Sequence, residues 1–324
     1  MPEHSQIEIG LNAAIVALVD GNPALLRTID STGQLPDALP YGRFDPTNHR
    51  TMEEGLRELA EAQTGLRPGY IEQLYTFGDR GRMPVIGDST PHVVSVGYLA
   101  LTRFNPEQAE EFSDEHAGWR SWYDFFPWED WRNQRPSHLD DTIIPALLKW
   151  ASSQGRAKNL VRGLDPLSRI RIAFGLEDSR WDDELVLDRY ELMYSAGLVA
   201  EAVADGRTDT VRTPALPGSP MRHDHRRILA TAIARLRGKL KYRPVIFELM
   251  QESFTLTDLQ QTVESIFGRG IHKQNFRRLV ENAKLVEQTG ASEHSTGGRP
   301  AALFRFRSEI LKERPAPGLR VGRS

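Results

Sequence analysis

The sequence predicts an α+β protein with three parts: a mixed α/β domain at residues 1–110, a helical insertion at 111–221, and a winged helix-turn-helix domain at 222–324. Three observations support this prediction. Apolar runs typical of buried strands lie in the first hundred residues, five of the six tryptophans fall between residues 119 and 150, and the net charge changes sign near residue 222. A chain of 324 residues is long enough for about two domains and a large core.

The N-terminal domain begins with strand patterns around one helix. Residues 12–19 and 92–102 are rich in apolar and β-branched residues, which favours buried strands. Residues 52–63 carry an apolar stripe at helical spacing, with Thr51 as the expected N-cap and Gly65 as the stop signal.

A polar turn and a helical segment follow in the predicted order. Residues 74–82 contain Gly78 and Gly81, so we expect a turn there. The insertion has helical patterns at 142–152, 166–174 and 183–205. Its aromatic residues are expected to form a core under these helices; a base-stacking or ligand-cage role is the alternative. A Pro/Thr-rich stretch at 208–220 is typical of a linker.

The C-terminal segment is strongly basic. Residues 222–324 hold 20 Lys and Arg against 10 Asp and Glu, a net charge of +10, whereas the first 221 residues hold 21 and 34, a net charge of −13. A basic module of this size is typical of polyanion binding, most often to nucleic acid. A solvated charged surface is the alternative interpretation.

The same segment has the element order of a winged helix-turn-helix. An amphipathic helix at 223–242 carries Arg226, Arg227, Arg235 and Arg237 around its apolar stripe, and a short helix at 244–250 follows. Next come a helix at 257–267, a turn with Gly268 and Gly270, and a further helix at 272–284. Strands at 285–288 and 301–307 flank a polar, Gly-rich wing. We expect Thr257 and Gln260 to form a capping box on the helix at 257–267.

The helix at 272–284 is suited to the major groove of DNA. Gln and Asn can hydrogen-bond adenine edges, Arg can hydrogen-bond guanine, and a helix N-terminus favours contact with phosphate. An arginine in the wing can reach a phosphate or the minor groove. The expected DNA-binding residues are Thr257, Lys273, Gln274, Asn275, Arg277, Arg278 and Arg299.

Two parts of the chain resemble one known family. The run KYRPVIFELMQESFTLTDLQQTVESIFGRGIHKQNFRRLVENAKLVEQ, followed by GGRPAALFRF, resembles the winged-helix domain of the Nudix-related transcriptional regulators, the NrtR family. The runs LPYGRFDPTNHRTMEEGLRELAEAQTGL and EQLYTFGD resemble that family's Nudix-like domain. The long helical insertion is similar to that of the NadQ-type regulators of NAD biosynthesis in alphaproteobacteria. The resemblance implies a Nudix-like α/β/α sandwich in the N-terminal domain.

The Nudix motif tests whether that domain hydrolyses its ligand, because hydrolysis needs a cluster of Glu residues that holds a divalent metal over the pyrophosphate. If the motif is aligned on Gly65, Ala62 and Gln63 occupy the positions of the paired metal-binding glutamates. If it is aligned on Arg57, Glu58 and Glu61 are kept, but Ala62 replaces the second member of the pair. The first alignment keeps the apolar residues inward and is preferred. Both damage the metal cluster, so we expect neither catalytic nor metal-binding residues.

A nucleotide pocket without hydrolysis is therefore expected. The resemblance implies that this domain binds an NAD-related adenine nucleotide such as ADP-ribose, NAD or ATP as an effector, with no required cofactor. Cationic side chains near the motif suit phosphates, and aromatic side chains suit the base. The expected ligand-binding residues are Arg43, His49, Arg50, Tyr75, Phe77, Arg80 and Arg82.

Together these features predict a homodimeric repressor that binds double-stranded operator DNA upstream of NAD-synthesis genes and responds to the nucleotide. The helix at 223–242 is the expected coupling element. Two alternatives stay open: an active Nudix pyrophosphohydrolase with a nucleic-acid-binding appendage, and a front domain that only supports dimerisation. The chain has no Cys, no apolar run of membrane-spanning length and no signal-peptide pattern, so we expect a cytoplasmic protein.

Overall fold

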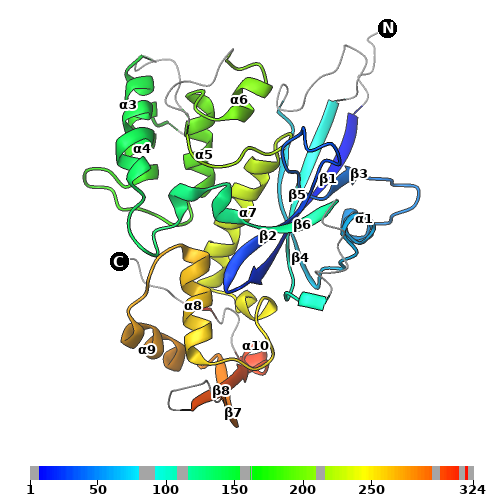
Figure 1. The fold of residues 1–324 in the computed structure, drawn as a ribbon, viewed down its shortest axis with the longest axis vertical. Coiled ribbons are helices and arrows are strands. Elements are labelled where there is room, and N and C mark those ends of the chain that lie inside the picture. Colours follow the sequence, from blue (N-terminus) through cyan, green and yellow to red (C-terminus); the bar gives the residue numbers. More distant parts are fainter. Residues whose placement is uncertain are drawn as a thin grey trace.

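The computed structural model describes residues 7–79, 92–107, 116–153, 161, 163–208, 216–293, 300–313 and 318–319. A β-sheet and a group of helices lie side by side, and the long helix α7 (His225–Leu240) runs between them (Figure 1). The winged helix domain lies at one end of α7 (Figure 1). The predicted α+β class is confirmed, with a Nudix-like α/β domain followed by a winged helix domain.

The N-terminal sheet is mostly antiparallel. Its strand order is β4-β5-β1-β2-β6, and β3 also pairs with β1. Strands β1 and β5 are parallel neighbours, whereas the other pairs are antiparallel. The strands are β1 (Ile7–Val19), β2 (Asn22–Thr28), β3 (Tyr41–Arg43), β4 (Tyr70–Phe77), β5 (His92–Leu101) and β6 (Ala117–Ser121).

The hairpin between β1 and β2 follows from two residues. Val19 pairs with Asn22, which leaves a two-residue loop of Asp20 and Gly21 with positive φ angles of 49° and 72°. Asp-Gly is a preferred pair for such a loop because both positions need a left-handed backbone.

One helix covers one face of the sheet. Helix α1 (Met52–Thr64) buries Leu56 and Ala60 against the sheet. The Thr51 side chain accepts a hydrogen bond from the Glu54 N–H at 3.1 Å, and the helix ends at Gly65 in a left-handed conformation. The predicted helix and both of its end signals are confirmed.

The predicted polar turn at residues 74–82 is wrong in its first half. Leu74 to Phe77 belong to β4, which pairs with β5 through a register shift between Gln73 and Thr76. Sheet pairing overrides the local turn signal because β5 supplies the backbone hydrogen bonds of this segment. Residues 80–82 lie outside the described residues.

Beyond strand β6, which was not predicted and which pairs with β2 in the N-terminal sheet, the insertion is helical as predicted. Trp122 and Trp128 are fully buried and Trp150 is 7% exposed, which supports the core interpretation of the aromatic residues. The predicted helix at 183–205 is wrong in its extent, because Gly197 adopts a φ of 70° and separates two shorter helices. The elements are η1 (Trp122–Asp124), η2 (Pro127–Glu129), η3 (Leu139–Ile143), α3 (Ile144–Ser153), α4 (Pro166–Phe174), α5 (Val186–Ser195) and α6 (Ala200–Ala204).

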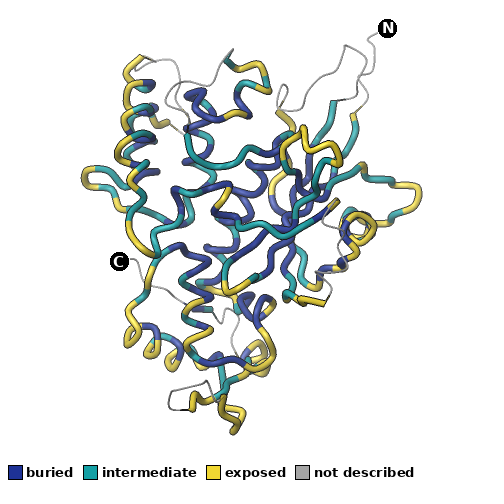
Figure 2. Tube along the Cα trace, in the orientation of Figure 1, coloured by how far each residue is buried: buried dark blue, intermediate teal, exposed yellow. Residues whose placement is uncertain are grey.

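Helix α7 lies at the centre of the molecule. It packs against β1, β4 and β5 on one side and against α5 on the other, and most of it is buried (Figure 2). Part of the predicted linker before it packs against the body: Ser219 donates its N–H to the Asp124 carbonyl oxygen at 2.8 Å and accepts from the Arg120 guanidinium at 2.6 Å. Residues 209–215 of that linker lie outside the described residues. The boundaries of the three domains stay predictions.

The winged helix domain has the predicted order of elements, but its cap differs. The N-cap of α8 (Leu256–Phe267) is Thr255, which forms a capping box with Asp258, so the predicted pair of Thr257 and Gln260 is wrong. The first wing strand runs further than predicted, through a register shift around Gly290. The other elements are η4 (Val245–Glu248), α9 (Lys273–Ala283), β7 (Val286–Glu293), β8 (Ala301–Phe306) and α10 (Ile310–Glu313).

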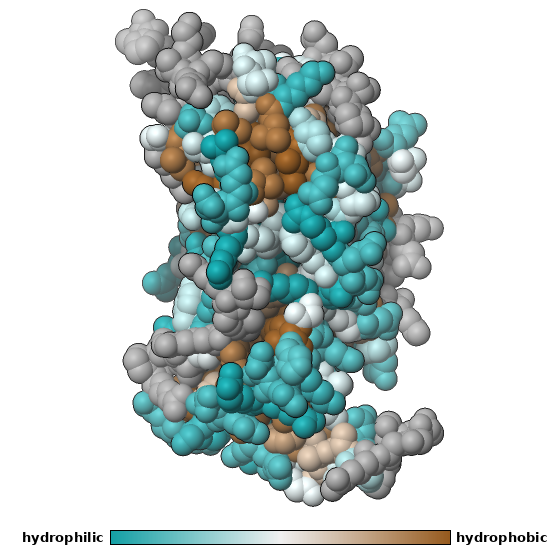
Figure 3. All heavy atoms as spheres, turned by 90° about the vertical axis from the view of Figure 1, so that its left-hand side faces the viewer, coloured by the Kyte–Doolittle hydropathy of each residue, from teal (hydrophilic) through white to brown (hydrophobic). Residues whose placement is uncertain are grey.

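The outer face of the insertion carries an apolar area. Figure 3 shows it in the upper part of the view, whereas the lower part, where the winged helix domain lies, is mainly hydrophilic. No helix in the described part of the chain is long and apolar enough to cross a membrane. The large exposed apolar side chains of the insertion are Leu148, Val161, Leu164 and Ile172.

Candidate functional site

One face of α9 in the winged helix domain is exposed and polar. Phe276 and Val280 are buried and anchor the helix against α8 and the wing strands. Among the described residues, no side chain caps its N-terminus, so its first-turn N–H groups are free for an external acceptor. The predicted groove-facing residues are all exposed, and their side chains form no hydrogen bond or ion pair with another described residue: Lys273, Gln274, Asn275, Arg277 and Arg278.

The turn before α9 is held by two side chains of α8. The Gln260 amide donates to the Ile271 carbonyl oxygen at 2.8 Å, and the Glu264 carboxylate accepts the Ile271 N–H at 2.7 Å. Gln260 also donates to Glu264 at 2.9 Å. Both backbone groups of Ile271 are therefore fixed, which sets where α9 begins.

The other two predicted DNA-binding residues are less defined. Thr257 is exposed in the first turn of α8, beside the capping box rather than in it. Arg299 lies outside the described residues.

The basic charge of α7 does not face outward as the sequence pattern suggests. Each of its four predicted surface arginines pairs with an acidic residue of the body. Arg226 and Arg237 are buried, because Glu201 and Glu129 neutralise them inside the protein. The four pairs are Arg226–Glu201 at 3.4 Å, Arg227–Glu191 at 2.6 Å, Arg235–Glu72 at 2.9 Å and Arg237–Glu129 at 2.7 Å.

On the Nudix-like domain, two predicted ligand residues, His49 and Arg50, lie on the connection between β3 and α1, and Arg43 is the last residue of β3. His49 approaches Glu58 at 2.8 Å between its Nε2 atom and the carboxylate, and its ring stacks near Phe44 with 6.4 Å between ring centroids. Arg43 is exposed and lies 3.6 Å from Glu8, and Arg50 is exposed beside the N-terminus of α1. His49 contacts α1 through Glu58, whereas Arg43 points to the other face of the sheet, because its neighbour Gly42 faces Leu59 of α1.

The structure does not bring all of the predicted ligand residues together. Phe77 is 7% exposed and packs in the core on the α7 side, under the Arg227 guanidinium at 4.7 Å from its ring centroid. Tyr75 is 54% exposed, with the Arg235 guanidinium 5.9 Å from its ring centroid. Arg80 and Arg82 lie outside the described residues. The assignment of these residues to a ligand stays a prediction.

The side chain of Gln63, at the position that the preferred alignment of the Nudix motif assigns to a metal-binding glutamate, binds the backbone of Tyr41. In the preferred alignment it replaces a metal-binding glutamate. Its amide accepts the Tyr41 N–H at 3.1 Å and donates to the Tyr41 carbonyl oxygen at 2.7 Å, so it joins α1 to β3. A neutral amide held in this way by backbone groups supplies no charge to a metal ion.

The four glutamates of α1 have separate partners. Among the described residues, no three His or acidic side chains lie close enough together to hold a metal ion. Glu54 accepts the backbone N–H of Arg50 at the start of the helix. The ion pairs of the other three are Glu53–Arg57 at 2.9 Å, Glu58–His49 at 2.8 Å and Glu61–Arg67 at 3.9 Å.

Sequence reasoning missed a group of insertion residues that contacts the helix-turn-helix. The Tyr123 hydroxyl donates to the Ser265 carbonyl oxygen at 2.6 Å, and the backbone N–H of Trp131 donates to the Gly268 carbonyl oxygen at 2.5 Å. The sequence of this segment shows only its high tryptophan content, because the residues that it contacts lie more than a hundred positions away.

The architecture is that of a Nudix-like domain joined to a winged helix domain. Residues 246–306 match the family described as the NrtR DNA-binding winged helix domain. Over 83 residues the chain is 42% identical to the "ADPR responsive transcriptional repressor NtrR" of Acinetobacter baylyi. This match covers 26% of the chain and spans about a third (33%) of the length of that relative.

Solved structures share the fold over nearly the whole chain. Shewanella oneidensis NrtR complexed with a 27mer DNA gives a TM-score of 0.55 at 20% identity, and the likeness covers 94% of this chain and 95% of that one. A MutT/nudix family protein from Enterococcus faecalis gives a TM-score of 0.52 at 16% identity, covering 95% and 89% of the two chains. At these identities the likeness shows a common fold.

Proposed function

We propose that this protein is a transcriptional repressor of NAD biosynthesis genes, of the NadQ type, that binds double-stranded operator DNA as a cytoplasmic homodimer. An adenine nucleotide bound to the Nudix-like domain controls it without being hydrolysed. ADP-ribose is the first candidate effector because the relative from Acinetobacter baylyi is named as ADPR responsive. NAD and ATP are the others.

The observation that carries this proposal is the polar face of α9. Two buried apolar residues hold the helix, and its exposed side chains and uncapped N-terminus are left for a partner. These are the groups that read base edges and contact phosphates in the major groove. The match of residues 246–306 to a DNA-binding winged helix family supports the same conclusion.

The connection between β3 and α1 is the proposed place for the effector. Arg43 at the end of β3 and Arg50 in the connection are exposed cations, and His49 in the connection lies beside Glu58. Exposed arginines suit the diphosphate of such a nucleotide because a guanidinium can bind phosphate through two parallel hydrogen bonds. Tyr75, Phe77, Arg80 and Arg82 complete the proposed ligand set.

A DNA-binding measurement tests the proposal. The full chain is titrated onto a promoter fragment of an NAD-synthesis gene and onto a random fragment of equal length, at physiological salt and with each nucleotide in turn. We expect preference for the promoter, a change in affinity with one nucleotide, and loss of the preference in Asn275→Ala. Lys149→Ala, an exposed change on α3, is the matched control. Equal binding to both fragments would refute the proposal.

The hydrolase alternative rests on the four glutamates of α1. It predicts turnover of ADP-ribose with Mg²⁺ that Glu58→Gln or Glu61→Gln abolishes. The ion pairs of these glutamates and the backbone contacts of Gln63 favour binding without turnover. Calorimetric titration with the same nucleotide separates a sensor, which binds it, from a domain that serves only dimerisation.

A further inference from the structure

The C-terminal end of α8 is completed by groups from the insertion and from α7. The last carbonyls of a helix have no partner within the helix and need one elsewhere. Here Ser265 accepts from the Tyr123 hydroxyl, and Ile266 accepts from Nε of Arg237 at 2.9 Å. A cation at this end of a helix also opposes the negative end of the helix dipole.

The same contact region continues into the turn before α9. The Gly268 carbonyl oxygen accepts the Trp131 N–H, and the Arg269 guanidinium pairs with Asp183 at 2.6 Å. A Cβ atom on Gly268 would lie only 2.1 Å from the Glu129 carbonyl oxygen, so the turn and the insertion are in close backbone contact. The turn that sets the start of the recognition helix is therefore held from behind.

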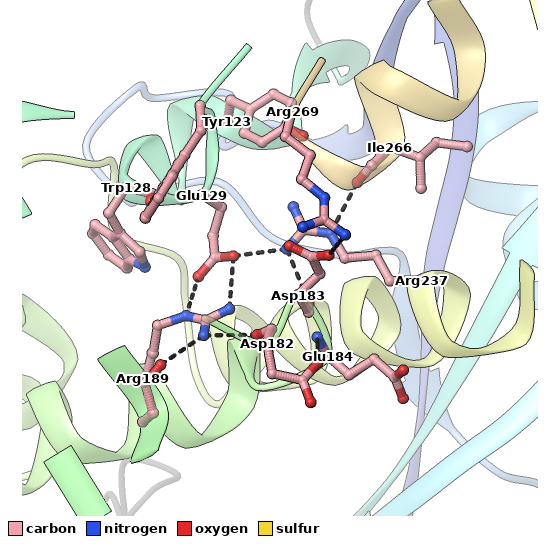
Figure 4. Close-up of polar contacts among 12 residues, drawn as sticks. Tyr123, Trp128, Glu129, Asp182, Asp183, Glu184, Arg189, Arg237, Ile266 and Arg269 are labelled. Atoms are coloured by element: carbon pink, nitrogen blue, oxygen red, sulfur yellow. Dashed lines mark hydrogen bonds and ion pairs between the residues drawn. The ribbon is translucent and has the colours of Figure 1, made fainter. Parts of the chain in front are cut away.

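A buried ion network fixes Arg237, the residue of α7 that makes one of these contacts (Figure 4). The Glu129 carboxylate accepts from Arg189 at 2.6 and 3.0 Å and from Arg237 at 2.7 Å, and all three side chains are fully buried. Burial opposes ionisation of Glu129, but the two guanidinium groups outweigh it and hold the pKa of this carboxyl below its usual value. The carboxylate thus stays charged and joins the insertion, α5 and α7.

Helix α7 connects this network to the sheet. Arg235 and Lys239 pair with Glu72 of β4 at 2.9 and 2.5 Å. Arg237, between them in the sequence, points to Glu129 and α8 instead. One helix therefore contacts the edge strand of the Nudix-like sheet and the end of α8 through neighbouring residues.

We propose that Tyr123, Trp131 and Arg237 form a clamp that fixes the orientation of the helix-turn-helix on the body, with Glu129 as its positioning residue. The clamp gives the Trp-rich insertion its role. Its consequence for DNA rests on the proposed function, whereas its effect on orientation does not.

A distance measurement between spin labels tests the clamp directly. The chain has no Cys, so Lys149→Cys on α3 and Glu281→Cys on α9 introduce two unique labelling sites at exposed positions. In this background, Glu129→Gln removes the charge that holds two buried arginines. Because that variant can fail to fold, Tyr123→Phe with Arg269→Gln is the second variant, since it removes the Tyr123 clamp contact and the adjoining Arg269–Asp183 ion pair and keeps the Glu129 network intact. Circular dichroism and thermal unfolding establish that each variant is folded.

We expect one narrow distance distribution in the parent and a clearly broader or shifted one in the folded Tyr123→Phe/Arg269→Gln variant. Tyr194→Phe is the matched control, because it removes a hydroxyl that donates to Asp205 at 2.8 Å elsewhere in the insertion. An unchanged distribution in the clamp variant, or equal broadening in the control, would overturn the proposal. The clamp variant should also bind promoter DNA about tenfold more weakly. If the parent protein binds no promoter DNA, the proposed function fails while the distance result still decides the clamp.

Discussion

Gly268 lies where the winged helix domain contacts the insertion, and its position leaves no room for a side chain. It ends α8 with a φ of 70°, and a Cβ atom there would meet the Glu129 carbonyl oxygen at 2.1 Å and the Tyr123 hydroxyl at 2.8 Å. Gly268→Ala therefore adds backbone strain and a collision with another backbone segment. Gly206 has a similar φ of 66° after α6, with nothing within 4 Å of its Cβ position. Gly206→Ala is thus a control for strain alone.

The two changes separate in magnitude. A left-handed backbone costs a residue other than glycine about 1–2 kcal/mol, and this is the whole expected cost of Gly206→Ala. Gly268→Ala adds an overpacking cost of about 1–3 kcal/mol. The displacement also breaks the hydrogen bond from Trp131, which is worth about 1 kcal/mol. We expect Gly268→Ala to lower the free energy of unfolding by about 3–6 kcal/mol in all.

Urea unfolding followed by circular dichroism measures both variants, and tryptophan fluorescence reports on the insertion next to the turn. Equal destabilisation by Gly268→Ala and Gly206→Ala would refute the close backbone contact between the turn and Glu129.

Three further predictions follow from single side chains. Arg278→Ala should weaken promoter binding by about 1–3 kcal/mol in a titration, with the unfolding free energy unchanged within about 0.5 kcal/mol, because its side chain is exposed. Thr255→Ala should cost about 1 kcal/mol in urea unfolding and Thr257→Ala almost nothing, since only the first caps α8; the reverse order would contradict this cap. Burial, His223 and Arg222 lower the pKa of His225 well below its usual 6.5, so the folded protein keeps it neutral while the unfolded chain protonates it below pH 6.5. Stability should therefore fall as the pH drops below 6.5, and His225→Asn, which keeps an acceptor for the Leu39 N–H, should flatten this dependence in unfolding measured from pH 7 to 5.

Local patterns predicted the elements that carry their own end signals. Helix α1 has Thr51 and Gly65 at its ends, and both act as predicted. The pattern was ambiguous for α8, because Thr255 and Thr257 each stand three residues before a side chain that can complete a capping box. The strand β4 was missed in part because its pairing depends on the partner strand β5, which the local pattern of β4 does not contain.

The candidate sites show the same division. The exposed face of α9 follows from helical spacing alone, since Phe276 and Val280 define the buried side. The arginines of α7 do not follow this rule. Arg237 is buried because Glu129, more than a hundred residues earlier, lies against it, and no local pattern contains that information. Counting every arginine after residue 222 therefore overstates the positive charge available to DNA.

The clamp on α8 binds mainly backbone atoms of the helix-turn-helix. Tyr123, Trp131 and Arg237 all donate to main-chain carbonyl oxygens, which every amino acid possesses. The side chains exposed on α9 take no part in these contacts. Substitutions that alter the DNA sequence recognised can therefore accumulate on α9 while its attachment to the body is retained, so operator preference can diverge between relatives that keep the same architecture.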